Sequence, residues 1–256
     1  MLLCPVRDCR QPLVREERRV VCARGHSFDV ARSGYINLLQ PQDRRSRDPG
    51  DTAPALQGRR RLHDLGVMTP LLDGIAEAME ASPQDRVLDV GCGNGDLLGT
   101  LAGRVGFAGY GVDISVSAVD AAARRYPGCD WIVANADRFV PYADRSFAAV
   151  LSITARMNAA EFRRVIREDG RLLVAVPATD DLVELRGQGR DRVARTIETF
   201  ATGYRLTRQN RITTTAELDA AAVQDVLHSI YRPRSRQPPG GMRLTFSLDL
   251  LLFQPV

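Results

Sequence analysis

The stretch "VLDVGCGNGDLL" (residues 87–98) decides the fold, because it joins an apolar strand-like run to a helix-like run through a glycine-rich turn. Glycines stand at positions 91, 93 and 95, and Asp89 lies two residues before the first of them. Glycine permits a tight turn whose backbone lies against a ligand, and the helix that follows offers free amide N–H groups. We therefore predict a strand, a ligand-binding loop and a helix in this stretch.

Strand-like and helix-like runs alternate on either side of this stretch. Strands are predicted at residues 86–91, 109–114, 130–135, 146–153, 170–177, 204–215 and 242–253. Helices are predicted at residues 69–81, 96–105, 115–126, 159–166, 191–201 and 218–227. This alternation is typical of βαβ units and predicts an α/β fold with a mostly parallel sheet covered on both faces. The last two strands are expected to form an antiparallel pair at one side of the sheet.

Two carboxylates, those of Asp89 and Asp113, indicate which class of ligand the glycine loop binds. The glycine spacing is G-x-G-x-G, and a carboxylate at Asp89 suits a cationic amino group better than a pyrophosphate, which it would repel. Asp113 lies 18 residues beyond Gly95, at the end of the next strand, where an acidic side chain typically accepts both ribose hydroxyls. The pattern resembles the cofactor site of class I S-adenosylmethionine-dependent methyltransferases. A nucleotide-binding Rossmann-like domain without transfer chemistry is the alternative.

This resemblance implies a Rossmann-like, seven-stranded sheet and a set of cofactor contacts. Residues after the third strand of the cofactor half, within "VANADRFVPY" (133–142), would meet the adenine. Residues in "VLSITAR" (150–156) would face the reacting methyl group. The cofactor-binding residues predicted in this way are Met68, Asp89, Gly91, Gly93, Asn94, Gly95, Asp113, Ile114, Asn135, Ala136, Asp137, Ser152 and Asp181.

The N-terminal residues carry a second motif. Cys4 and Cys9 are separated by four residues, and Cys22 and His26 by three, which are spacings found in structural zinc sites. The residues between the pairs supply a turn and two short strands, so one hairpin would bring all four ligands together. A bound Zn²⁺ would provide the folding free energy that about 35 residues cannot draw from a core. Unrelated cysteines are the alternative interpretation.

Together, the motifs resemble one family. The cysteine pattern, "GHSFDVARSGYINLL" (25–39), "RSRDPGD" (45–51) and the glycine loop are similar to the RlmA family of 23S ribosomal RNA (guanine-N1)-methyltransferases, from Cys4 to about Glu184. The resemblance implies that Zn²⁺ binds Cys4, Cys9, Cys22 and His26, that the zinc module recognises an RNA hairpin, and that the Rossmann-like domain binds S-adenosylmethionine. The expected divisions are a zinc-binding module at 1–39, an arginine-rich linker and helix at 40–68, and the methyltransferase domain at 69–256. Family members usually have two residues between the first cysteines, so the four here indicate a looser first knuckle.

The chain departs from the family around the substrate. Met68 stands where the family has a tyrosine, Asp181 where it has a histidine, and Ala155-Arg156 where it has Ala-Pro; the segment at 227–243 is shortened. Methylation of guanine N1 requires loss of the N1 proton, and Asp181 is a candidate base for that step or, alternatively, a cap of the following helix. Arg156 is a candidate to stabilise the negative charge that develops on O6, or to contact phosphate.

Composition sets wider limits. The 256 residues carry a formal net charge of +4, and every basic residue other than histidine is an arginine. The stretches "RRSR" (44–47), "RRR" (59–61) and "RPRSR" (232–236) could follow an RNA backbone or form solvated surface. We expect neither a membrane-spanning run nor a secretory signal, and we therefore expect a cytoplasmic location. A homodimer is left open. A relative recruited to a small molecule and a non-catalytic RNA-binding relative are the other functions considered.

Overall fold

The computed structural model describes residues 1–43, 50–230 and 240–256. Its strands are β1 (Leu13–Glu16), β2 (Arg19–Cys22), β3 (Ser27–Asp29), β4 (Ile36–Asn37), β5 (Arg86–Val90), β6 (Ala108–Asp113), β7 (Asp130–Val133), β8 (Phe147–Ile153), β9 (Ile166–Pro177), β10 (Tyr204–Leu218) and β11 (Met242–Pro255). Its helices are η1 (Pro41–Asp43), α1 (Ala53–Asp64), α2 (Thr69–Met79), α3 (Asp96–Val105), α4 (Val116–Arg125), α5 (Ala159–Val165), α6 (Val183–Arg186), α7 (Val193–Phe200) and α8 (Ala220–Ser229). Each predicted strand and helix is present.

Within the described residues, the main sheet has eight strands in the order β10-β11-β9-β8-β5-β6-β7-β4. The strands from β4 to β9 are parallel, and β11 and β10 continue the sheet antiparallel to β9 and to each other. The predicted α/β class and the antiparallel closing pair are confirmed. The sheet has one strand more than the seven predicted, because β4 contributes two residues that pair with β7. A run of two residues is too short to show a period in the sequence.

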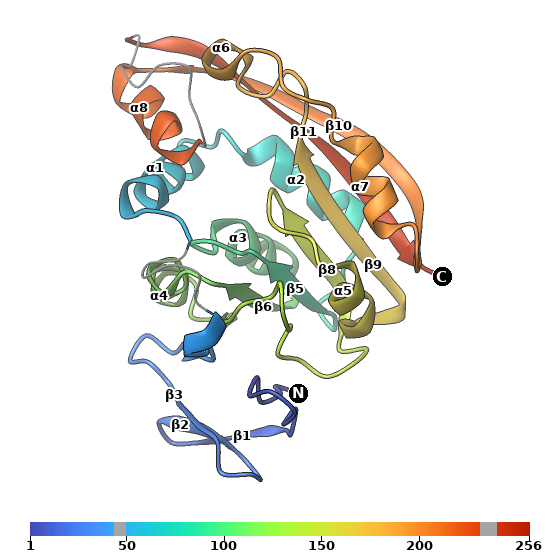
Figure 1. Cartoon of the computed structure of the whole chain (residues 1–256). Helices are drawn as coiled ribbons and strands as arrows, with labels where there is room; N and C mark the ends of the chain where they lie inside the picture. The colour runs from blue at the N-terminus through green and yellow to red at the C-terminus, as the bar shows by residue number, and fades with distance from the viewer. Residues whose placement is uncertain (44–49, 231–239) are drawn as a thin grey trace.

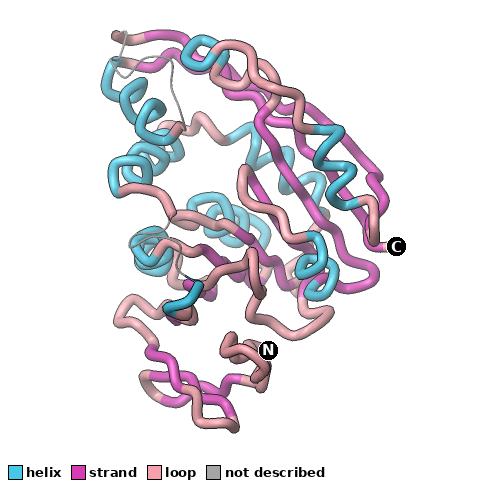
Figure 2. Tube along the Cα trace, viewed as in Figure 1, coloured by secondary structure: helices cyan, strands magenta, loops and turns pink. Residues whose placement is uncertain are grey.

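The two faces of the sheet are covered by different elements. Apolar residues of α2, α3 and α4 pack on one face, where Leu72, Leu98 and Val119 meet Val87 and Leu151. The other face carries α5 and α7 through Phe162 and Phe200. Figures 1 and 2 show that α7 and α5 lie over the β9 side of the sheet while α3 and α4 lie near β5 and β6.

A third apolar cluster stands beyond the carboxyl ends of the parallel strands. We call α1, α6, α8 and the distal part of the β10–β11 hairpin the roof, since their side chains form this cluster; it includes Leu62, Leu185, Val223, Val226 and Leu244. Helices α1 and α8 are in close contact, because a Cβ at Gly58 would lie 2.8 Å from the carbonyl oxygen of Asp225. The roof is visible at the top of Figure 1, at the opposite end of the molecule from the N-terminal strands.

The N-terminal strands form a small antiparallel sheet, β1-β2-β3, within residues 1–43. Backbone pairing joins this module to the larger domain, because Leu2 forms a bridge with Tyr142 and β4 pairs with β7. Leu13 and Val20 belong to the same apolar cluster as the β5 and β6 residues Leu88 and Val112. The module therefore shares a core with the larger domain. No helix in the described part of the chain is long and apolar enough to cross a membrane.

Candidate functional site

The glycine loop after β5 is held by Asp113 at the end of β6. The Gly93 amide donates to Asp113 Oδ2 at 2.9 Å, and the Ser115 amide donates to Oδ1 at 2.8 Å. Gly91 and Gly93 both have positive φ, at 84° and 54°. A Cβ at Gly93 would meet no atom within 4 Å, so open space lies beside the backbone there. Each oxygen of Asp113 keeps a free lone pair for a further donor.

Asp89 is the least satisfied carboxylate of the loop. Its side chain is buried, with 3 % of the residue exposed, and Oδ1 has no hydrogen-bond partner among the described residues. Burial raises the pKa of Asp89 to about 7, and the neighbouring charge of Asp113 adds to the effect. A buried carboxyl group without a donor is costly unless a ligand supplies one. An ammonium group would satisfy it, as the sequence predicted.

The first cavity, of about 570 Å³, opens at the carboxyl ends of β5, β6, β7 and β8. Asp113 lies in its wall, and the residues that follow β7 form its far side. The Asn135 side chain holds this far side in shape, because its amide donates to the Asp43 carbonyl at 3.1 Å and its oxygen accepts from the Asp137 amide at 3.1 Å. Arg156 is at the rim, with 78 % of its side chain exposed and a guanidinium nitrogen 3.4 Å from Asp137. The predicted site residues in the wall of the first cavity are Gly91, Asp113, Ile114, Asn135, Ala136, Asp137 and Arg156.

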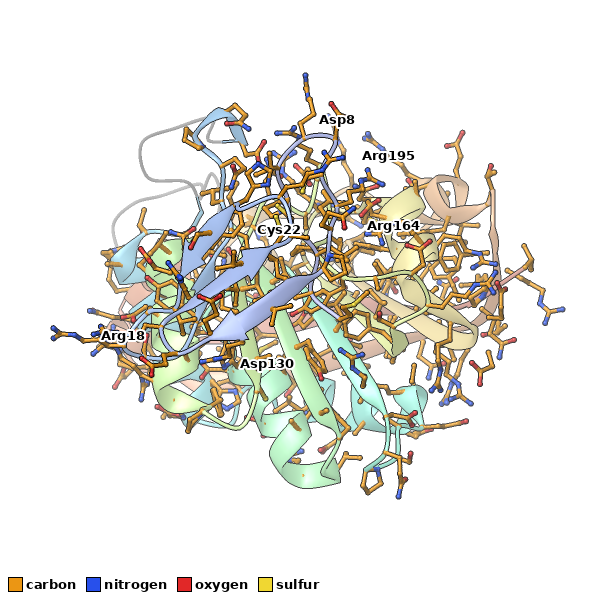
Figure 3. The ribbon with its side chains drawn as sticks, turned by 90° about the horizontal axis from the view of Figure 1, so that it is seen from below. Asp8, Arg18, Cys22, Asp130, Arg164 and Arg195 are labelled. Atoms are coloured by element: carbon orange, nitrogen blue, oxygen red, sulfur yellow. The ribbon has the colours of Figure 1, made fainter. Side chains whose placement is uncertain are left out.

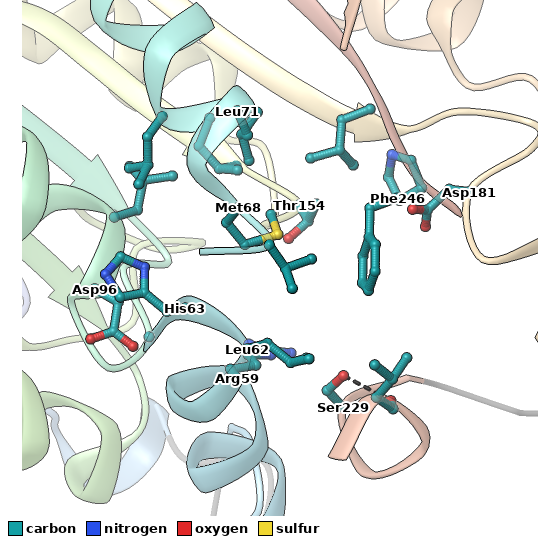
Figure 4. Close-up of a pocket in the computed structure, with 18 of the residues that line it drawn as sticks. Arg59, Leu62, His63, Met68, Leu71, Asp96, Thr154, Asp181, Ser229 and Phe246 are labelled. Atoms are coloured by element: carbon teal, nitrogen blue, oxygen red, sulfur yellow. Dashed lines mark hydrogen bonds between the residues drawn. The ribbon is translucent and has the colours of Figure 1, made fainter. Parts of the chain in front are cut away.

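The second cavity, of about 380 Å³, lies between the carboxyl edge of the sheet and the roof. It shares Arg59, Gly91, Ile153 and Thr154 with the first cavity, so the two meet where β5 and β8 end. Met68 lines the second cavity and packs against both the roof cluster and the α2–α4 cluster. Figure 4 shows Met68 and Thr154 on one side of this cavity and Asp181 with Phe246 on the other.

Asp181 is fixed in the wall of the second cavity. Its Oδ1 accepts from the Ser247 amide at 3.0 Å, and its Oδ2 accepts from the Arg186 guanidinium. Burial raises the pKa of Asp181, although the Ser247 amide and the Arg186 charge act in the opposite direction. The residue that caps α6 is Leu182, with φ of 51° and no side-chain bond. The helix-cap interpretation of Asp181 is therefore wrong, because its carboxylate bonds to β11 and to the last residue of α6.

The N-terminal module brings its four predicted ligands together. The Sγ atoms of Cys4, Cys9 and Cys22 and a ring nitrogen of His26 all lie within 4.8 Å of one another. His26 Nδ1 is 3.4 Å from both Cys4 and Cys22, and the Cys9 and Cys22 sulfurs are 3.8 Å apart. A tetrahedron with zinc–sulfur bonds of about 2.3 Å has edges of about 3.8 Å, so these distances fit Zn²⁺. Figure 3 shows Cys22 in the middle of the module.

The Cys22 thiol already has the character of a metal ligand. Burial acts to raise its pKa, but hydrogen bonds from the backbone amides of His26 and Arg24 outweigh this effect and lower the pKa to about 7. A thiolate is the form that binds zinc, and a thiol that ionises near neutral pH loses its proton readily to the metal. The residues of the module thus fit Zn²⁺ by position and by ligand type, since three sulfurs and one imidazole nitrogen form a set found in structural zinc sites.

Comparisons with known proteins match both parts of the chain. Residues 2–47 match the family model described as "RlmA, N-terminal", and residues 87–175 match "Methyltransferase domain". The 23S rRNA (guanine(748)-N(1))-methyltransferase of Streptomyces fradiae is 35 % identical over 237 residues, which cover 88 % of this chain and 83 % of that protein.

The chain belongs to the family of RlmA-type 23S rRNA (guanine-N1)-methyltransferases. Solved structures with low sequence identity share the fold. One is a chain from the complex between the Haloferax volcanii Trm112 methyltransferase activator and a methyltransferase. The TM-score is 0.56 at 20 % identity, and the match covers 78 % of this chain and 93 % of that chain. A geranyl diphosphate methyltransferase in complex with S-adenosylmethionine has a TM-score of 0.51 at 15 % identity and covers 82 % of this chain and 93 % of that chain.

The predicted residues of this RlmA-type chain divide between the two cavities, with two exceptions. Met68, Asp89, Gly93, Asn94 and Asp181 line the second cavity. Gly95 and Ser152 line neither. Gly95 is required for packing, because a Cβ there would lie 2.5 Å from the Trp131 ring. Ser152 is buried in β8, and its hydroxyl donates to the Arg156 carbonyl at 3.4 Å.

Among the residues of the second cavity that were not predicted as site residues from the sequence are Arg59, Arg186 and Phe246. Phe246 lies in an apolar strand-like run, where an aromatic residue gives no sign of facing a cavity. Arg186 follows "LVEL" without any motif of its own, so no signal was available. Arg59 belongs to "RRR" (59–61), for which an RNA-backbone contact and solvated surface are the two interpretations from the sequence.

The basic stretches are only partly described by the structure. In "RRR" (59–61), each arginine lies near a carboxylate: Arg59 with Asp51 at 2.6 Å, Arg60 with Asp64 at 4.0 Å, and Arg61 with Asp225. Their charges are thus partly compensated within the protein. The stretches "RRSR" (44–47) and "RPRSR" (232–236) lie outside the described residues.

Proposed function

We propose that this protein transfers a methyl group from S-adenosylmethionine to N1 of a guanine in 23S ribosomal RNA. The observation that carries the proposal is a largely buried carboxylate, Asp181, in a cavity that meets the cofactor cavity at the end of β8. Family membership supports the substrate, because the Streptomyces fradiae relative is named for N1 methylation of guanine 748.

The first cavity and the glycine loop provide the cofactor contacts. Asp89 would accept a hydrogen bond from the amino group of S-adenosylmethionine, and the two free lone pairs of Asp113 would accept the ribose hydroxyls. The wall formed by Asn135, Ala136 and Asp137 would surround the adenine. When bound, S-adenosylmethionine supplies an electrophilic methyl group on a positively charged sulfur. With the cofactor held by these residues, the methyl group would face the junction of the two cavities, where β5 and β8 end.

The second cavity provides the contacts to the base. Asp181 is placed to accept the proton from guanine N1, which leaves the nitrogen nucleophilic. Because burial raises its pKa, the carboxylate is a stronger base than an exposed aspartate would be. Phe246 supplies an apolar face beside Asp181, and roof residues such as Leu62 and Val226 form an apolar part of the wall. Orientation of the base by such walls would contribute to the rate beside the proton transfer.

We assign recognition of the surrounding RNA to the zinc module. The module is joined to the sheet at β7, which ends beside the first cavity, so RNA bound to the module is held at a fixed position relative to the methyl donor. Arg15 in β1 and Arg18 after it are exposed and provide positive charge for phosphates, whereas Arg19 is paired with Glu16 at 2.6 Å. Figure 3 shows Arg18 pointing away from the body of the molecule.

Transfer of a labelled methyl group tests the proposal. Purified protein is incubated with methyl-labelled S-adenosylmethionine and 23S rRNA transcribed in vitro, which carries no modification. We expect label in the RNA, 1-methylguanosine among the nucleosides after digestion, and one stop in reverse transcription at the modified guanine. Label confined to a small molecule from a cell extract, or no label although the cofactor binds, would contradict the proposal.

A further inference from the structure

Asp181 and Arg186 form a pair whose hydrogen-bonding capacity is only partly used. Arg186 is the last residue of α6, and its guanidinium donates to Asp181 Oδ2, while the Ser247 amide donates to Oδ1. Both side chains line the second cavity. Arg186 Nε is buried and has no partner in the part of the chain that the structure describes. Each carboxylate oxygen accepts one bond and has room for a second.

This pair matches the hydrogen-bonding edge of guanine. That edge presents two donors, N1–H and the N2 amino group, beside one acceptor, O6. A carboxylate accepts from the donors, and an adjacent guanidinium donates to the acceptor. Adenine presents the reverse arrangement, with an acceptor at N1 and a donor at N6. An adenine in the same position would therefore place lone pair against carboxylate and N–H against guanidinium, which is unfavourable.

We propose that Asp181 and Arg186 together recognise the N1 edge of the target base and make the second cavity specific for guanine. The inference rests on the proposed function. In the reaction, the N1 proton passes to Asp181, the electron pair of N1 forms the bond to the methyl carbon, and the carbon–sulfur pair leaves with sulfur. The negative charge that N1 would gain spreads to O6, where the Arg186 guanidinium stabilises it.

The geometry favours Arg186 over Arg156 for the O6 contact. Arg156 lines the first cavity, is largely exposed and faces Asp137. Arg186 lines the second cavity and contacts the carboxylate that would hold N1. The Arg186 side chain is 26 % exposed and is held by Asp181, whereas the Arg156 side chain is 78 % exposed, and a fixed, partly buried donor stabilises developing charge better than an exposed one does. The role expected for Arg156 therefore passes to Arg186.

A purely structural role for Arg186 would be to anchor α6 on β11. Glu184, on the same helix, already forms such an anchor, because its carboxylate accepts from the Thr245 amide at 3.1 Å and from the Thr245 hydroxyl at 2.7 Å. Glu184 does not line either cavity. Glu184→Gln is therefore a matched control, since it weakens the anchor of α6 and leaves the cavity walls unchanged.

The experiment compares Arg186→Gln, Arg186→Lys and Glu184→Gln with the unchanged protein on an RNA hairpin around the guanine mapped by reverse transcription. Arg186→Gln should lower kcat about 10²-fold, as loss of one fixed donor to a developing oxyanion does. It should also move the acidic limb of the pH profile to higher pH, because Asp181 loses its cationic partner. Arg186→Lys should recover part of kcat, and Glu184→Gln should stay within about threefold of the unchanged protein.

A second measurement requires no RNA methylation. Ligand-observed NMR with guanosine monophosphate and adenosine monophosphate, in the presence of S-adenosylhomocysteine, should show preference for the guanine nucleotide, and Arg186→Gln should abolish it. Equal binding of the two nucleotides, an unshifted pH limb, or equal losses in Arg186→Gln and Glu184→Gln would overturn the proposal. If 23S rRNA is not methylated but the guanine preference is present and depends on Arg186, the proposed RNA substrate is wrong and the pair retains its role.

Discussion

The two cavities share a wall at the ends of β5 and β8 but are built in different ways. Apart from Gly50, Asp51 and Arg59, the first cavity is lined by residues between positions 90 and 156, at the ends of strands that follow one another in the chain. The second is lined by residues from Arg59 to Leu248, which meet only because the roof packs over the sheet. The first cavity is thus a local product of the βαβ pattern, and the second depends on tertiary packing.

This difference explains what the sequence could predict. The carboxyl ends of parallel strands meet at one edge of a sheet, so Asp89, Asp113 and Asn135 could be brought together once the strands were recognised. The two ligand pairs of the module, Cys4 with Cys9 and Cys22 with His26, could also be predicted from the sequence, because the ligand spacing within one hairpin is local.

The second cavity could not be assembled in the same way. Arg61 and Asp225 are 164 positions apart, and no periodicity indicates that α1 and α8 are neighbours. For the same reason Phe246 and Arg186 were missed, whereas Arg156, a candidate for the O6 charge or for a phosphate contact, lies at the rim of the first cavity. Strand β4 was missed because it is two residues long.

The largest effect on methyl transfer is expected at Asp181, which lines the second cavity and not the first. Asp181→Asn keeps the size of the side chain but removes the base, so methyl transfer should fall about 10³-fold while the affinity for S-adenosylmethionine stays within about twofold. Single-turnover rates and calorimetry measure the two quantities. An equal loss of cofactor affinity would show that the two cavities do not work separately.

Substitution of Asp113 should affect cofactor affinity and leave the rate of methyl transfer nearly unchanged, the opposite of the result expected for Asp181. Asp113→Ala removes the acceptor for the ribose hydroxyls and the partner of the Gly93 amide, and we expect about 1.5–3 kcal/mol weaker cofactor binding, or about 12- to 150-fold in Kd. The methyl-transfer rate at saturating cofactor should change by less than about threefold. Asp113→Asn, which keeps one acceptor, serves as the milder variant. Its cofactor affinity, measured by calorimetric titration, should lie between that of the unchanged protein and that of Asp113→Ala.

Phe246 tests whether the second cavity holds a base by its face. Phe246→Leu removes the ring, and since contact of a base with an aromatic ring is worth about 1–3 kcal/mol, kcat/KM for RNA should fall about tenfold. Cofactor affinity should be unchanged, and Phe246→Tyr, which retains a ring, should remain close to the unchanged protein. Steady-state kinetics at varied RNA concentration provide the measurement; identical values for the two variants would argue against a role for the ring.

The smallest effect concerns the pH dependence of cofactor binding at Asp89, in the strand that leads into the glycine loop. The raised pKa of Asp89, about 7, belongs to the free protein, and the ionised form is the one that binds an ammonium group. Cofactor affinity is therefore present above this pKa and is lost as the pH falls through it, by about fivefold between pH 7 and pH 6. Titrations at both values should show this decrease, and Asp89→Asn should bind weakly but with little change over the same interval.

Strand β4 also has a consequence for self-association. Its two residues cover part of the backbone edge of β7, and they belong to the module whose geometry depends on Cys4, Cys9, Cys22 and His26. Removal of the metal would loosen the module and expose that edge, and uncovered strand edges recruit further strands. We expect protein treated with a chelator to form soluble aggregates, detectable by light scattering, and the metal-loaded protein to remain free of them.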